Sequence, residues 1–221
     1  MTSIEPLTSR RVSRWSIQTA DLLLGNHDRA IADHNRAIAL APKLAMAYGE
    51  LGTAYGYKRD FDRSITNLIT AIKLAPKDPT YLRQRGYVQF CRGDFEAAAA
   101  DLRNALDLAD DTYTVLFHYL ARARTTGGAL HELETHANRA RDGKWPAPMI
   151  ELYLGTRDVN SALAAANNVD ERGEAQFFLG QWHLLRNDRT QAIKAFQAAA
   201  CSCPTWFVEH AAAIAELGRL Q

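Results

Sequence analysis

Two histidines and two glutamates lie close together in the segment His131-Glu-Leu-Glu-Thr-His136. A zinc-protease site on a helix needs two histidines four residues apart, with a glutamate between them, so that both imidazoles face the metal. Here the histidines are five residues apart, which turns the second ring about 140° from the first, at about 100° per residue. The segment therefore predicts a solvated helix face rather than a metal site.

Three cysteines are the other residues with a reactive side chain. Cys201 and Cys203 are separated by one serine, which is not the C-x-x-C spacing of redox and zinc sites. They fall in the last turn of an expected helix, before Pro204, where small residues usually serve packing. Cys91 is expected to be a small, partly buried hydrophobic residue. An odd number of thiols fits a reducing compartment better than an oxidising one.

Phosphate-binding and nucleophile motifs are missing as well. Gly143-Lys144 lacks the upstream glycine and the following serine or threonine of a phosphate-binding loop, and the sequence has no G-x-S-x-G segment. We therefore expect no catalytic residues, no metal and no cofactor. A metal- or thiol-dependent enzyme is the alternative from another class. Tightly bound zinc, or activity lost on substitution of Cys201 or Cys203, would favour it.

Composition and charge narrow the classes of partner. The chain has 221 residues, 47% hydrophobic and 23% charged, as in ordinary globular proteins. Its formal net charge of +1 makes a nucleic-acid binder with strongly salt-dependent affinity a disfavoured alternative. No apolar run approaches the ~20 residues of a spanning helix, and residues 1–18 lack the apolar core of a secretory signal. A soluble, cytoplasmic protein without a membrane anchor is expected, with the periplasm as the alternative if a longer precursor carries a signal.

The element that would position any functional side chain is a helical hairpin over residues 44–76. In a 34-residue frame, small residues fall where two helices would cross, large residues surround that crossing, and a proline ends the second helix. The small residues are Gly52 and Ser64, the large ones are Tyr48, Leu51, Tyr55 and Leu68, and the proline is Pro76. The pattern resembles the tetratricopeptide repeat, a helix–turn–helix of this period.

The resemblance implies an all-α fold: a right-handed superhelix (α-solenoid) of helix–turn–helix repeats with a C-terminal capping helix. Residues 1–10 are expected to be a tail, followed by four repeats over 11–144. The later part consists of an irregular insert of short helices, one further repeat and the cap. The repeats are 11–44, 45–78, 79–112 and a degenerate 113–144, followed by the insert at 145–172, a repeat at 173–204 and the capping helix at 205–221.

The turn inside each hairpin recurs at 34-residue steps, at Gly25, Arg59, Gly93 and Gly127. The period thus survives where one glycine is lost. The second helix of the fourth repeat is polar, so we expect it to be more exposed than its neighbours. In the insert, Gly155 is expected to cap a short helix.

The C-terminal half carries a narrower resemblance. Segments beginning at Val115, Met149, Ala175 and Phe207 occur in the order found in NlpI-type bacterial lipoproteins. Those proteins are non-catalytic, dimeric adaptors that bring a periplasmic protease to cell-wall hydrolases, so the resemblance implies an adaptor role. The lipid-accepting cysteine of that family is missing here, so its membrane anchor is not implied.

The preferred function is a non-enzymatic adaptor that binds peptide or protein segments in a concave groove lined by the first helix of each repeat. Aromatic residues and arginines are enriched in binding hot spots. Arg83 and Tyr87, one helical turn apart, are the favoured contacts, whereas Phe90 and Phe117 fit packing between helices equally well. The expected groove residues are Met46, Glu50, Tyr57, Arg83, Gln84, Tyr87, Phe90, Phe117, His118 and Arg124.

One specialised function of such grooves is disfavoured. A subgroup of these repeats holds the C-terminal carboxylate of a chaperone with lysine and asparagine at fixed groove positions. This chain has Trp15, Thr19, Glu50, Thr80 and Gln84 at such positions, so binding of that kind is not expected.

The closing helix offers a second surface. Phe207, Ala211, Ile214 and Gly218 follow a helical spacing, and one apolar stripe must pack on the preceding hairpin. We hypothesise that the apolar remainder forms a symmetric homodimer interface. Its residues are Trp206, Phe207, Ile214 and Leu217. A monomeric mass by light scattering at micromolar concentration would count against it.

Overall fold

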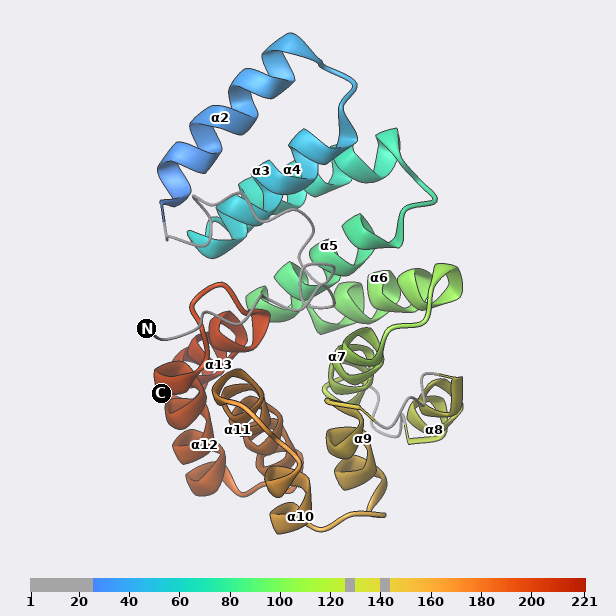
Figure 1. Cartoon of the computed structure of the whole chain (residues 1–221), viewed down its shortest axis with the longest axis vertical. Helices are drawn as coiled ribbons and strands as arrows, with labels where there is room; N and C mark the ends of the chain where they lie inside the picture. Colours follow the sequence, from blue (N-terminus) through green and yellow to red (C-terminus); the bar gives the residue numbers. More distant parts are fainter. Residues whose placement is uncertain (1–25, 126–129, 140–143) are drawn as a thin grey trace, which may run out of the picture. The chain divides into compact units, whose positions relative to one another are not determined.

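The structure, a computed structural model, describes residues 26–125, 130–139 and 144–221. These residues form twelve α-helices and no strand (Figure 1). In chain order the helices are α2 (His27–Leu40), α3 (Ala45–Tyr57), α4 (Phe61–Leu74), α5 (Pro79–Arg92), α6 (Phe95–Leu108), α7 (Thr112–Ala123), α8 (Leu130–Arg139), α9 (Ala147–Leu154), α10 (Val159–Ala164), α11 (Val169–Leu184), α12 (Arg189–Ser202) and α13 (Val208–Arg219). The predicted tail, the first helix of the first repeat and the turn at Gly127 lie outside these ranges.

The chain divides into two compact units, Met1–Arg85 and Gly86–Gln221, here called unit 1 and unit 2. In unit 1, α2 packs on α3 and α3 packs on α4. In unit 2, α6 packs on α7, α11 on α12 and α12 on α13. Helices that follow one another in sequence are therefore neighbours in space, and the predicted all-α solenoid of helical hairpins is confirmed.

Each regular hairpin closes where a glycine meets a large side chain. A Cβ atom added to Gly52 would lie 2.7 Å from Cγ of Leu68, closer than two carbon atoms can approach. The equivalent pairs are Gly86 with Leu102 at 2.7 Å and Gly180 with Phe196 at 2.6 Å. All three large partners are fully buried. The predicted close approach at Gly52 and Ser64 is confirmed, since the Cβ added to Gly52 would also lie 3.1 Å from the backbone oxygen of Ser64. Leu68, expected among the residues around the crossing, lies directly against the glycine.

The turn inside the hairpin uses a left-handed residue. Arg59 has φ 60°, Gly93 has φ 100° and Asn187 has φ 59°, all in a region that glycine enters without steric cost. The residue that follows each of them is an aspartate at the helix N-cap, namely Asp60, Asp94 and Asp188. The recurrence of this turn in the sequence therefore reflects the need for a left-handed backbone conformation. Arg59 adopts that conformation at a cost in strain.

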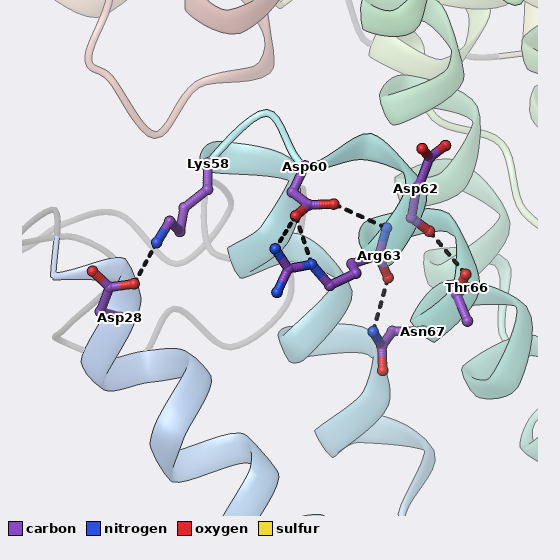
Figure 2. Close-up of polar contacts among 7 residues, drawn as sticks. All are labelled: Asp28, Lys58, Asp60, Asp62, Arg63, Thr66 and Asn67. Carbon is purple, nitrogen blue, oxygen red and sulfur yellow. Dashed lines mark hydrogen bonds and ion pairs between the residues drawn. The ribbon is translucent and has the colours of Figure 1, made fainter.

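Side chains next to this turn hold the start of α4 in place (Figure 2). The backbone N–H of Arg63 donates to Oδ1 of Asp60 at 3.2 Å, and its Nε donates to Oδ2 at 2.6 Å. Lys58, just before the turn, pairs with Asp28 in the first turn of α2. An aspartate at the N-cap satisfies an otherwise unpaired N–H and favours the positive end of the helix dipole.

The degenerate repeat and the insert depart from the regular frame. α8 buries Leu133, while His131 and Glu134 are exposed. The predicted cap of α9 is confirmed, because Gly155 has φ 74° and its N–H bonds to the last turn. α11 begins at Val169, four residues before the point where the sequence frame resumes, so its first turn belongs to the segment predicted as an insert.

A buried carboxylate ties this irregular segment to α11. Glu174, on α11, is 1% exposed. Its Oε2 accepts hydrogen bonds from the Tyr113 hydroxyl at 2.7 Å and from the Trp145 indole at 2.6 Å. One side chain therefore joins the start of α7, the segment before α9, and α11.

Replacing Gly52 with alanine is expected to lower the free energy of unfolding by about 1–3 kcal/mol, because the added methyl group cannot fit beside Leu68. Gly218→Ala is the matched control, since a Cβ there would meet no atom within 4 Å. It should be neutral or stabilising by up to about 1 kcal/mol. Urea unfolding followed by circular dichroism measures both, and equal effects would mean that close packing does not set the helix separation.

Arg59→Gly is expected to raise the free energy of unfolding by about 0.5–1 kcal/mol. Relief of a left-handed backbone worth roughly 1–2 kcal/mol exceeds the entropy that glycine adds to the unfolded chain. Asn187→Gly should give a smaller gain, because asparagine tolerates this conformation. Destabilisation by Arg59→Gly in the same urea assay would show that the turn is not strained.

Candidate functional site

The aromatic residues predicted for the groove lie inside unit 2. Tyr87, Phe90 and Phe117 are each 0% exposed. The ring centroid of Phe117 lies 4.8 Å from that of Tyr87, 5.2 Å from Phe90 and 5.6 Å from Phe177. Phe117 and Phe177 stack at 18°, which brings α11 against α7. These side chains pack between helices in the interior of unit 2, and in the described chain they offer no open surface.

His118 is also covered. It is 3% exposed, and its Nε2 lies 3.9 Å from Oε2 of Glu132 on α8. Nε of Arg122 lies 3.5 Å from the same oxygen. The polar residues of the degenerate helix α8 therefore contact α7, and the predicted groove position of His118 is beneath them.

Arg124, the last predicted groove residue in unit 2, belongs to a buried ionic cluster. Its Nη1 donates to Oε1 of Glu216 at 2.8 Å, and Glu216 lies on α13 and is 0% exposed. Gln181 on α11 donates to the same oxygen at 3.0 Å. Arg219, one turn after Glu216, donates from Nε to the other oxygen at 3.1 Å. Three donors from three elements thus hold one carboxylate.

The same two arginines share an aromatic ring. The guanidinium carbon of Arg124 lies 4.4 Å from the ring centroid of Phe95, and that of Arg219 lies 5.5 Å from it. Nη1 of Arg219 also donates to the backbone oxygen of Cys91 at 3.0 Å. Cation–π contacts of this kind gain strength when they are shielded from water. Within unit 2, α13 is therefore joined to the end of α5 and to the start of α6.

The charge state of Glu216 follows from these neighbours. Burial alone would raise the pKa of its carboxyl group. Hydrogen bonds from Arg219 and Gln181 and the charges of Arg124 and Arg219 outweigh that effect, so the pKa lies below its ordinary value of 4.5. The group is ionised at neutral pH and stabilises the folded chain in that form.

Sequence reasoning did not identify Glu216, Gln181 or Arg219 as a cluster. A signal was present: Glu209 and Glu216 are seven residues apart and share one helix face with Ala212 and Ala213. All four are 0% exposed, so this stripe packs on the hairpin. The predicted dimer residues Trp206, Phe207, Ile214 and Leu217 are half-buried, and the dimer stays a prediction.

The other predicted groove residues belong to unit 1, on α3 and the first half of α5. Met46 is 40% exposed, whereas Glu50 and Gln84 are 2% and 0% exposed. Tyr57 and Arg83 are half-buried. Three of the five therefore have side-chain surface available in unit 1, and we call Met46, Tyr57 and Arg83 the α3–α5 face.

Small residues on α3 let aromatic rings approach its backbone. A Cβ on Gly49 would lie 2.4 Å from Cε1 of Tyr81, so the Tyr81 ring packs on the bare helix. Burial, together with the charges of Asp78 and Glu50, raises the pKa of the Tyr81 hydroxyl. Tyr57 stacks on His27 with a centroid separation of 5.3 Å. Tyr81 and Tyr57 are thus packed on residues of their own unit.

The three cysteines do not form a reactive cluster in the described part of the chain. Cys91 and Cys203 are each 5% exposed, and Cys201 is exposed. Cys203 packs against Gly173, where an added Cβ would meet its Sγ at 2.9 Å. Across the described ranges, no group of three or more histidine, cysteine, aspartate or glutamate side chains is placed to bind a metal ion.

Comparison with known families agrees with the hairpin geometry. Residues 50–112 match the family model of the tetratricopeptide repeat, a span that contains the Gly52–Leu68 and Gly86–Leu102 contacts. No curated protein matches the chain. None of the helices in the described part is long and apolar enough to cross a membrane. The narrower resemblance of the C-terminal half stays a prediction.

Acidification is expected to weaken the attachment of α13. Because the pKa of Glu216 is lowered in the folded chain, its contribution to stability is complete above pH 4.5 and is lost as the pH falls through the folded pKa. The urea midpoint of Glu216→Gln should therefore change less between pH 5.5 and 3.5 than that of the unmodified chain. Identical pH profiles would contradict this assignment.

Proposed function

Because this chain is a tetratricopeptide-repeat protein, we propose that it is a non-enzymatic adaptor that binds an extended protein segment on the α3–α5 face. Tetratricopeptide repeats are protein–protein interaction modules, and the first helix of each hairpin commonly lines their binding side. The specific adaptor role and the choice of face go beyond the family.

The exposure of Met46 carries the proposal. Its side chain is 40% exposed on α3, where eight of the thirteen residues are buried. Methionine adapts its shape to different apolar partners, so an exposed one is a suitable contact for a partner's apolar side chain. Arg83 adds a guanidinium that can hold a carboxylate or a backbone carbonyl.

A comparison with unit 2 also supports the α3–α5 face as the binding site. There the equivalent positions are occupied by Tyr87, Phe90 and Phe117, which are fully buried and pack on side chains of the chain itself. In unit 1 the corresponding residues of α3 are Gly49, Thr53 and Gly56, which are small and buried. Tyr81 already packs on Gly49, so a partner segment would contact Met46 and the accessible parts of Tyr57 and Arg83.

Site-specific photo-crosslinking in cells tests the proposal. A photo-reactive phenylalanine analogue at Met46 or Arg83 is expected to give discrete adducts with one or a few proteins, because both positions contact the bound segment. The same analogue at Thr66, an exposed residue of α4 (Figure 2), is the matched control and should give none of these adducts.

Two outcomes other than the expected pattern of adducts would also be informative. Adducts from Thr66 alone, or equal adducts from all three positions, would contradict the α3–α5 face as the binding site. A protease or a cell-wall hydrolase among the proteins joined at Met46 would favour the narrower adaptor role predicted from the C-terminal half.

A further inference from the structure

α13 occupies a surface built by four residues from earlier parts of unit 2. We call these residues the α13-binding surface: Cys91 on α5, Phe95 on α6, Arg124 at the end of α7 and Gln181 on α11. Each of them contacts Glu216 or Arg219, and each contact is polar or involves a guanidinium over a ring. These four residues therefore contact α13 through the carboxylate of Glu216 and the guanidinium of Arg219.

The charges on the two sides are complementary. The surface supplies the cation of Arg124 and the amide donor of Gln181, and α13 supplies the carboxylate of Glu216. Arg124 keeps 21% of its side chain exposed, whereas Glu216 keeps none. A carboxylate placed here gains two donors from the surface, while an apolar helix would leave the guanidinium and the amide without an acceptor.

The apolar part of the same contact is small. The buried apolar residues of α13 are Val208 and the alanines Ala212, Ala213 and Ala215. A regular hairpin instead buries a leucine or phenylalanine against a glycine, as at Gly180 and Phe196. Since apolar stabilisation scales with the area removed from water, α13 is held less by burial than α11 and α12 hold each other. Its attachment depends to a larger degree on the Glu216 cluster.

We propose that α13 is an exchangeable occupant of the α13-binding surface, and that a partner helix with a small-residue face and a glutamate in its C-terminal half binds there when α13 leaves. This site lies wholly in unit 2 and does not depend on the α3–α5 face. Release of α13 would expose Phe95, Arg124 and Gln181 together, so binding at this surface would be coupled to opening of the chain's own helix.

A labelled peptide of residues 205–221 is the probe, added to the full-length chain. In the unmodified protein, the tethered α13 competes at a high effective concentration, so the peptide should bind weakly. Glu216→Gln and Arg219→Ala weaken the tethered helix and leave the binding surface unchanged, since both residues lie on α13. Each variant should bind the peptide at least about tenfold more tightly than the unmodified chain, measured by fluorescence anisotropy.

Two controls make the result specific. Gly218→Ala, where an added Cβ meets no atom within 4 Å, does not weaken the tethered helix and should not raise peptide affinity above that of the unmodified chain. A peptide with Glu216→Gln should bind the Arg219→Ala chain about tenfold more weakly than the native peptide, and adding Arg124→Met to that chain should reduce this preference. Arg219→Ala retains the buried carboxylate and its pairing with Arg124. It can therefore be used alone in the binding test if Glu216→Gln fails to fold.

The proposal is overturned if folded variants bind the native peptide no more tightly than the unmodified chain. Equal binding of the native and Glu216→Gln peptides would also overturn it, because recognition would then not involve the carboxylate.

Discussion

The contact between a glycine and a large buried side chain determines the regular part of this fold. At Gly52, Gly86 and Gly180 the paired helix comes closer than a Cβ atom would permit. That separation fixes which faces of the two helices meet, and the left-handed turn at Arg59 and its equivalents fixes the register at which they meet. These two conditions recur in successive hairpins at the 34-residue period, at Gly52 and Gly86 and at Arg59 and Gly93. The degenerate fourth repeat lacks this pair, because it has Leu120 in place of the glycine and His136 in place of the large residue, yet α7 still packs on α8.

A second constraint, the buried carboxylate of Glu216, distinguishes unit 2 from an open array of hairpins. A charge with no exposed surface requires donors from every side, and the chain meets this requirement with Arg124, Gln181 and Arg219. The helix that carries Glu216 is thereby drawn onto residues of α5, α6, α7 and α11. In our proposals, α13 occupies the α13-binding surface of unit 2, and a partner segment binds the α3–α5 face of unit 1.

The hairpins could be predicted from the sequence because the contacts that form them join residues close to one another along the chain. Gly52 and Leu68 are sixteen residues apart, and Gly155 acts within one turn of α9, so spacing alone predicts these contacts. The groove residues could not be predicted in the same way. Phe117 packs on Phe177 of α11, which follows an insert of irregular length, and Tyr87 and Phe90 pack in turn on Phe117. The burial of Glu216 could not be predicted from the sequence, because a charged residue on a helix is ordinarily solvated. Only the arrangement of α7 and α11 shows that this one is buried.

Hydrogen exchange of the intact chain, resolved by proteolytic peptides and mass spectrometry, tests most directly whether α13 is a separable helix that closes unit 2. If it is, amides of α13 exchange through local opening well before those of α11 and α12, and Arg219→Ala accelerates the exchange of α13 while leaving that of α12 unchanged. If α13 exchanges only at the rate of α12, in both the native chain and the variant, the helix is an inseparable part of the core, and unit 2 holds no surface that a partner could enter.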